Sequence, residues 1–319
     1  MGTATATPEA RDAVTVVEVG PRDGLQNEDR TVPTATKVEL IRRLVAAGAR
    51  AVEVGAFVRP DRVPQMADSD EVIAGLALPP GVRAIALVPN TAGLERALRT
   101  GVTEVAVFAA ASEAFSRANL GRSVRESLDM FRPVVEGARR AALRVRGYVS
   151  TVLGCPYQGP VPLDSVRTVV AALLDMGCDE ISLGDTIGVG TPAQVHELLD
   201  ALDGVLPLPM TAVHMHDTYG MGLANTLAAI EHGVRTVDTS VGGLGGCPFA
   251  GPGARGNLAT EDLVYALRGS RLTTGLDLDA LVAISWWLAE ELDHDPPSRV
   301  AQALGRQRRR ALQAPSTLD

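Results

Sequence analysis

The chain has 319 residues, of which 46% are apolar and 21% are charged, and its formal net charge is −8 at neutral pH. This length fits two average domains or one α/β barrel, which commonly needs about 250 residues. The negative charge disfavours a general nucleic-acid surface, although it does not exclude an anionic small-molecule substrate.

The N-terminus and the cysteines indicate the cellular setting. Residues 1–13 lack the apolar core of a secretory signal and carry Glu9 and Asp12, so we expect this segment to be disordered. No apolar run is long enough to span a membrane. The three cysteines are too few and too scattered for a disulfide framework. These features predict a soluble, cytoplasmic protein.

Short apolar runs alternate with amphipathic helical patterns along most of the chain. In residues 34–47, Val38, Ile41 and Leu44 share one helical face, and residues 163–176 carry a similar stripe. Several helical patterns end in glycine before the next apolar run. The strands predicted by this alternation are residues 14–19, 51–55, 83–88, 103–108, 144–152, 179–183, 210–215 and 235–240.

Eight β–α units in one chain predict an α/β fold, a closed parallel (β/α)8 TIM barrel with extra C-terminal helices. A doubly wound open sheet is the alternative. The barrel domain is expected over residues 14–304, ending in helices near 277–293 and 297–304 whose tryptophans pack on the barrel or on a partner subunit. Residues 305–319 are rich in arginine, and we expect them to form a solvated tail.

Side chains suited to catalysis or metal ligation lie at the C-terminal ends of several predicted strands, the end where TIM barrels build their sites. Strands one, two, seven and eight are neighbours in a closed barrel, so these side chains should converge on one rim. They are Arg22 and Asp23 on a loop after strand one, Glu53 ending strand two, Asp185 after strand six, His214 and His216 ending strand seven, and Cys247 and Asn257 after strand eight.

The His214-Met215-His216 sequence would place two imidazoles on the same side of a strand. Paired neutral imidazoles suit a divalent cation, although such a pair alone also occurs by chance or in a core. With Asp23 and Asn257 the set would mix oxygen and nitrogen ligands. Such a set favours Mg²⁺ or Mn²⁺ with substrate oxygens completing the coordination, and disfavours a closed structural zinc site.

Five segments occur in order between about residue 14 and residue 304. They read VEVGPRDGLQNE, RGYVSTVLGCPYQG, EISLGDTIGVGTP, VHMHDTYGMGLANT, and GGLGGCPFA followed by GNLATEDLVY. Together they resemble the 3-hydroxy-3-methylglutaryl-CoA (HMG-CoA) lyase family of metal-dependent TIM-barrel lyases. The resemblance implies cleavage of HMG-CoA into acetyl-CoA and acetoacetate, as in leucine degradation. It also implies an acyl-CoA substrate, a divalent cation and a homodimer, with neither a nucleic-acid partner nor a membrane.

The resemblance carries over residue by residue. Asp23, His214, His216 and Asn257 match the metal ligands, and Arg22 matches the arginine that stabilises the enolate of the leaving acetyl-CoA. Cys247 matches the catalytic loop cysteine, Glu53 an active-site glutamate, and Asp185 an acidic residue of the same pocket. His214 is also expected to be a catalytic residue. The residues expected to bind the cofactor are Arg22, Gln26 and Asn119.

Two of these roles remain open between direct and indirect action. Glu53 would either act on the substrate or hold Arg22, and Asp185 would either touch the substrate or bond a neighbouring loop. The general base would be Asp23 or His216. The loop from Cys247 to Asn257 is one residue longer than the family spacing, which leaves open how Cys247 meets the substrate.

Three other functions compete with HMG-CoA cleavage. A related 3-hydroxy-3-alkylglutaryl-CoA could be the substrate, because a few side chains can change the acyl pocket. A Claisen-type acyl-CoA condensing synthase shares the machinery, but such synthases usually continue into a regulatory region. A metal-binding barrel without activity is disfavoured because the set of site residues is complete.

Overall fold

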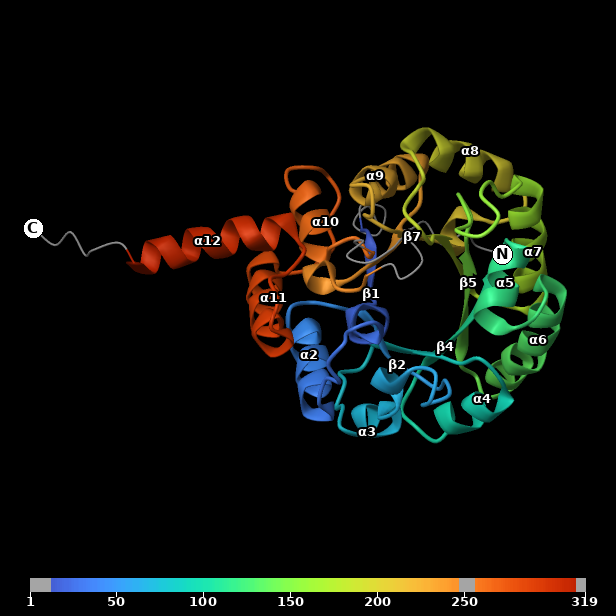
Figure 1. The fold of residues 1–319 in the computed structure, drawn as a ribbon, viewed down its shortest axis with the longest axis horizontal. Coiled ribbons are helices and arrows are strands. Elements are labelled where there is room, and N and C mark those ends of the chain that lie inside the picture. Colours follow the sequence, from blue (N-terminus) through green and yellow to red (C-terminus); the bar gives the residue numbers. More distant parts are fainter. Residues whose placement is uncertain (1–12, 247–255, 314–319) are drawn as a thin grey trace, which may run out of the picture.

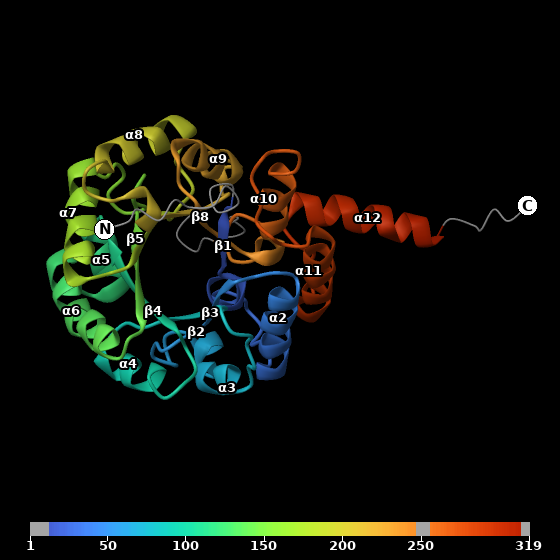
Figure 2. The same ribbon diagram turned by 180° about the vertical axis from the view of Figure 1, so that it is seen from behind.

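The computed structural model describes residues 13–246 and 256–313 of the chain. Eight parallel strands pair in chain order and close into a barrel through β1 and β8, with helices around the outside (Figure 1 and Figure 2). The strands are β1 (Thr15–Glu18), β2 (Ala51–Ala56), β3 (Arg83–Leu87), β4 (Glu104–Ala110), β5 (Arg144–Ser150), β6 (Glu180–Asp185), β7 (Thr211–Met215) and β8 (Thr236–Thr239). The predicted TIM barrel is confirmed, and the open sheet is excluded.

Helices follow every strand, and β4 is followed by two. They are α2 (Thr34–Ala46), α3 (Ser69–Ala74), α4 (Thr91–Ala97), α5 (Glu113–Leu120), α6 (Val124–Arg140), α7 (Leu163–Met176), α8 (Pro192–Leu202), α9 (Gly222–His232) and α10 (Thr260–Ala266), with α11 (Leu278–Leu292) and α12 (Arg299–Gln313) added at the end. Among the described residues, no helix combines the length and the apolar character needed to cross a bilayer.

The helix α7 illustrates why these segments fold as they do. Its buried residues Val166, Val169, Val170 and Leu173 form one stripe, and a fully buried aliphatic side chain of this kind contributes about 1.5–3 kcal/mol. The helix ends at Gly177, which adopts a left-handed φ of 101° that glycine reaches without the steric cost of a Cβ atom. The buried apolar stripe thus favours a helix here, and the left-handed glycine at its C-terminal end sets where α7 ends.

The C-terminal helices contact the barrel layer of the same chain. The Arg43 guanidinium of α2 stacks 4.2 Å from the ring centroid of Trp287 in α11, while the indole Nε1 of Trp286 joins α11 to α12 by donating to the carbonyl of Ala301 at 2.9 Å. The helix α12 continues to Gln313, so the prediction that this helix ends at residue 304 was wrong. Residues 306–313 are arginine, glutamine, alanine and leucine, all good helix formers, and they extend the helix past Gly305.

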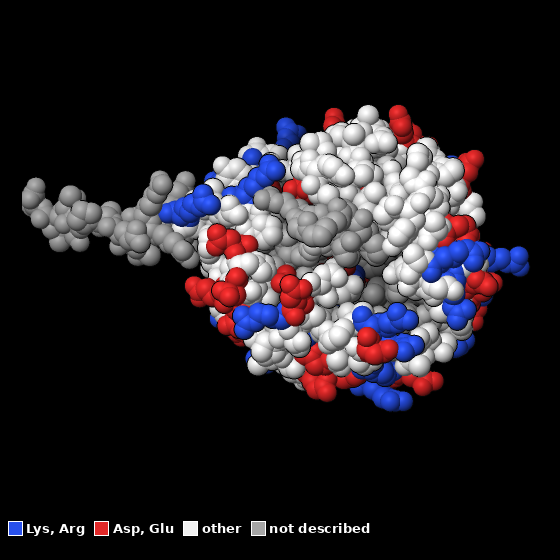
Figure 3. Space-filling view, viewed as in Figure 1, with Lys and Arg blue, Asp and Glu red and all other residues white. Residues whose placement is uncertain are grey.

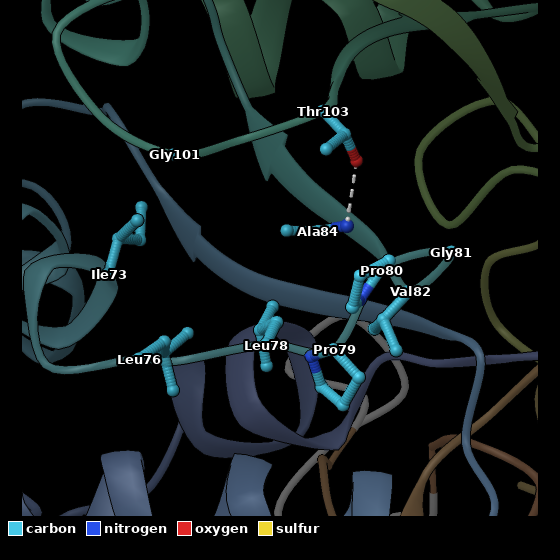
Figure 4. A pocket seen from close by; sticks show the side chains of 10 residues that line it. All are labelled: Ile73, Leu76, Leu78, Pro79, Pro80, Gly81, Val82, Ala84, Gly101 and Thr103. Atoms are coloured by element: carbon cyan, nitrogen blue, oxygen red, sulfur yellow. Dashed lines mark hydrogen bonds between the residues drawn. The ribbon is translucent and has the colours of Figure 1, made fainter.

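The outer surface carries both signs of charge. In Figure 3, basic and acidic side chains are interspersed around much of the edge of the molecule. A separate pocket of about 250 Å³ lies at the opposite end of the barrel from the residues discussed below. Its lining includes Leu78, Val82, Ala84 and Thr103, at the beginnings of β3 and β4, where the Ala84 amide donates to Thr103 Oγ1 at 3.0 Å (Figure 4).

Candidate active site

Arg22 and Asp23 lie on a single wide helical turn, η1 (Gly20–Gly24), directly after β1. The carbonyl of Val19 accepts from the backbone amides of Arg22, Asp23 and Gly24 at 3.1, 2.8 and 3.2 Å. Pro21 stands at the start of this turn, where its fixed φ suits helical geometry and its missing N–H is no loss. The sequence placed Arg22 and Asp23 on a loop after the first strand; the structure shows that this connection is a hydrogen-bonded and mostly buried helical turn.

The Arg22 guanidinium is held between two carboxylates. Its Nε donates to Glu53 Oε2 at 2.8 Å, and its Nη1 lies 2.5 Å from Asp23 Oδ1. Burial alone would lower the pKa of Arg22, but the charges of Glu53 and Asp23 outweigh it and raise that pKa. Burial likewise opposes ionisation of Asp23, yet the charge of Arg22 brings the pKa of Asp23 below its usual range. The pair is therefore charged at neutral pH.

His214 and His216 converge as the sequence predicted. The two Nε2 atoms lie 3.1 Å apart, and Asp23 Oδ2 lies 3.9 Å from His214 Nε2. One ligand atom from each of the three residues fits within 4.8 Å of the others. Two imidazole nitrogens and a carboxylate aimed at one point form a donor set that a divalent cation fits. The residues present therefore fit the expected metal.

The protonation of His216 agrees with this fit. Burial, together with the charge that His214 carries when it is protonated, lowers the pKa of His216 to about 4. The ring is thus neutral near pH 7, the form that binds a cation. His214 differs, since burial lowers its pKa but the hydrogen bond and charge of Asp238 raise it overall.

Asn257, which follows β8 in the sequence, contacts the same cluster. It forms an isolated bridge with His216, and its Nδ2 donates to Asp23 Oδ2 at 2.9 Å and to the Leu244 carbonyl at 3.1 Å. Because a metal ligand must present its carbonyl oxygen, ligation by Asn257 requires the opposite amide orientation. A Cβ at Gly245, whose φ is +99°, would lie 2.6 Å from Asn257 Nδ2, so this approach requires glycine.

Glu53 and Asp185 are both fully buried and engaged with neighbouring groups. Glu53 holds Arg22, as described above, which favours the indirect role for this glutamate. Asp185 accepts from the backbone amides of Val189 and Gly190 at 3.2 and 2.9 Å, so it bonds the loop that follows β6. For Asp185 the geometry favours the loop-bonding role over contact with the substrate.

The remaining predicted residues lie away from the cluster or outside the described residues. Gln26 is half-buried just after the η1 turn, and Asn119 is exposed in the last turn of α5, after β4. Cys247 falls in the segment 247–255, outside the described residues. The roles of these three residues remain predictions.

The sequence reasoning missed a buried polar chain behind the histidines. Asp238 of β8 contacts His214 Nδ1 at 3.2 Å, Arg146 Nη2 at 2.6 Å and Ser182 Oγ at 2.8 Å. Tyr148 completes it, with its hydroxyl accepting from Arg146 Nη1 at 3.0 Å. The available signal was a charged residue inside an apolar strand, which needs a buried partner.

A TIM barrel with an Asp–His–His donor cluster and a paired arginine at the C-terminal strand ends defines a class of enzyme, the metal-site barrels whose chemistry lies at that rim. Residues 13–287 match the HMGL-like family model, and the chain belongs to that family. This confirms the resemblance that the five sequence segments indicated.

Characterised relatives are similar over nearly the whole chain. The hydroxymethylglutaryl-CoA lyase of Pseudomonas mevalonii is 52% identical over 92% of this chain and 97% of its own length. The 3-hydroxy-3-isohexenylglutaryl-CoA/hydroxy-methylglutaryl-CoA lyase of Pseudomonas aeruginosa is also 52% identical, over 91% of this chain and 97% of its own.

Solved structures agree with the fold. A crystal structure of hydroxymethylglutaryl-CoA lyase from Pseudomonas aeruginosa has a TM-score of 0.91 and 51% identity, covering 93% of this chain and 98% of that one. An HMG-CoA lyase from an Acinetobacter baumannii source, solved with coenzyme A and 3-methylmalate, has a TM-score of 0.88 and 37% identity, covering 95% and 97% of the two chains.

Proposed function

We propose that this protein is a metal-dependent carbon–carbon lyase that cleaves HMG-CoA into acetyl-CoA and acetoacetate, the chemistry of leucine degradation. The observation that carries the proposal is the cluster of Asp23, His214 and His216 beside the buried Arg22. The cluster lies in a chain about half identical to curated lyases of that name.

The proposed cation is Mg²⁺ or Mn²⁺, held by Asp23, His214, His216 and Asn257. When bound, such an ion acts as a Lewis acid that lowers the pKa of an alcohol beside it. Asp23 or His216 would take the proton of the C3 hydroxyl. Asp23 is ionised beside Arg22 and His216 is neutral, so both residues are in their basic forms at neutral pH.

Arg22 would stabilise the negative charge of the enolate. Breaking the C2–C3 bond leaves the electron pair on the thioester, while C3 becomes the ketone of acetoacetate. The guanidinium is fixed by Glu53 and Asp23, so it need not reorganise as charge develops. One well-placed donor of this kind typically contributes about 3 kcal/mol. Glu53 is thus proposed as the residue that positions Arg22.

Cys247 would complete the reaction by giving its thiol proton to the enolate carbon, which yields acetyl-CoA. Cys247→Ser should leave Mn²⁺ binding and substrate binding unchanged while lowering turnover by orders of magnitude. Near-normal turnover in this variant would remove Cys247 from the reaction and implicate the longer loop.

A second candidate substrate has a longer acyl branch. One relative at 52% identity is named for both 3-hydroxy-3-isohexenylglutaryl-CoA and hydroxy-methylglutaryl-CoA. The test compares kcat/KM of the metal-loaded protein on the two thioesters. A higher value for HMG-CoA supports the main proposal, and a higher value for the isohexenyl compound would replace it.

The acyl-CoA would lie along the rim at the C-terminal strand ends. A relative at 37% identity was solved with coenzyme A, which supports a CoA-bearing ligand. Arg22, Gln26 and Asn119 are proposed as binding residues, and Asn119 is exposed in the last turn of α5, where it can contact a molecule on the rim. A cytoplasmic homodimer is proposed on the resemblance and the cysteine count.

A further inference from the structure

The side chain of Asp238 is fully buried behind His214, on the side away from Asp23. Its Oδ1 faces Arg146 Nη2 at 2.6 Å, and its Oδ2 faces both Ser182 Oγ at 2.8 Å and His214 Nδ1 at 3.2 Å. Three different strands, β5, β6 and β7, therefore direct polar groups at this one carboxylate of β8.

The partners of Asp238 determine its hydrogen-bonding role. Arg146 has no exposed surface and is always a donor. Its Nε lies 3.0 Å from Glu180 Oε1, and its Nη1 donates to the Tyr148 hydroxyl, so the guanidinium is fixed from three sides. A carboxylate paired with this cation accepts only, and His214 must therefore present a proton at Nδ1.

A neutral imidazole with its proton on Nδ1 has its lone pair on Nε2. In His214, Nε2 is the atom that faces His216 Nε2 at 3.1 Å and Asp23 Oδ2 at 3.9 Å. The ring orientation that places Nδ1 against Asp238 also directs Nε2 toward His216 and Asp23. The lone pair of this tautomer therefore lies where it can bind a cation.

We propose that Asp238 is a positioning residue that holds His214 in the Nδ1–H tautomer and directs its Nε2 lone pair into the metal cluster. Arg146 and Ser182 orient the Asp238 carboxylate for this task. The inference rests on the proposed metal site but not on the identity of the substrate. Partners behind a ligating histidine typically change metal affinity by about 10–100-fold when they are removed.

Asp238→Asn is the variant that reverses the tautomer. Since Arg146 only donates, the amide oxygen of the new side chain must face Arg146, and the NH₂ group then faces Ser182 and His214. His214 Nδ1 must accept, its proton moves to Nε2, and ligation is blocked. The dissociation constant for Mn²⁺, measured by titration calorimetry on the full chain, should rise about 10–100-fold.

Ser182→Ala is the matched control, because it removes the other contact of Asp238 Oδ2 but leaves the acceptor for His214. Its Mn²⁺ affinity should stay close to that of the unaltered protein. Wild-type affinity in Asp238→Asn would overturn the proposal, as would an equal loss in both variants. Melting temperatures of both variants separate a loss of metal binding from a loss of stability.

A direct measurement keeps the proposal testable if Asp238→Asn does not fold. Long-range ¹H–¹⁵N NMR spectra of the unaltered, metal-free protein, recorded at a pH above the raised pKa of His214 so that the ring is neutral, report which nitrogen of His214 carries the proton. A proton on Nδ1 is expected, and a proton on Nε2 would contradict the proposal. A protein with the Nδ1–H tautomer and Mn²⁺ binding but no cleavage of HMG-CoA would refute the proposed function alone.

Discussion

Replacing Glu261 by glutamine should remove a large pH dependence of stability. Glu261 lies on α10 with no exposed surface, and both of its carboxylate oxygens lie 3.0 Å from the Gly242 amide nitrogen. Ser285 donates to the same carboxylate. Burial raises the pKa of Glu261 from 4.5 to about 8, against the opposing effect of these hydrogen bonds. The glycine turn that leads toward Cys247 is thus held by a carboxyl that is protonated at neutral pH.

The size of the effect follows from that pKa. Each unit of difference between the folded and unfolded states corresponds to about 1.4 kcal/mol. Above pH 4.5 the unfolded chain loses the Glu261 proton while the folded chain keeps it, so the free energy of unfolding falls as pH rises. The free energy of unfolding falls by about 5 kcal/mol in total once the pH is above 8. About 4 kcal/mol of this decrease occurs between pH 5 and pH 8.

Urea denaturation of the metal-free protein at pH 5 and pH 8 measures this loss. Glutamine cannot ionise. The free energy of unfolding of Glu261→Gln should therefore increase by about 4 kcal/mol relative to that of the unaltered protein as the pH rises from 5 to 8. Glu95→Gln, at an exposed position of α4, provides the control and should change little with pH. If the difference between Glu261→Gln and the unaltered protein were the same at both pH values, the inferred protonation of Glu261 would be refuted.

Other substitutions test the site itself. His214→Ala should abolish stoichiometric binding of a divalent metal along with turnover, and normal metal affinity in a metal titration would remove His214 from the ligand set. Arg22→Lys keeps the charge but loses the two-sided contact with Glu53 and Asp23. It should lower kcat by about 10²–10³, while the affinity for Mn²⁺ stays close to that of the unaltered protein. An unchanged kcat in steady-state assays would exclude Arg22 as the enolate stabiliser.

Sequence periodicity predicted the barrel because its strands and helices are locally consistent. Each of the eight predicted strands overlaps an observed one, and residues 163–176 coincide with α7. Closure of the barrel then brings Asp23 near His214, although 190 residues separate them in the sequence, counting from position 24 to position 213. The convergence of these side chains on one rim thus followed from topology alone.

The buried polar partners could not be predicted in the same way. Arg146 and Asp238 are visible in the sequence as charges within apolar strands, but their contact at 2.6 Å crosses the barrel interior from β5 to β8. Such a contact depends on the register of several strands. Lys37 is similar, since this single lysine is buried and paired with Asp68 at 2.6 Å, and no local pattern indicates that partner.

The most direct test of the proposed function is acetyl-CoA release from HMG-CoA by the purified protein. It is measured with Mg²⁺ or Mn²⁺, again after EDTA, and a third time after the metal is restored. The account predicts rapid release with metal, loss of release with EDTA, and recovery on restoration. Release that persists in EDTA, or no release from folded protein shown to bind the metal, would contradict a metal-dependent HMG-CoA lyase.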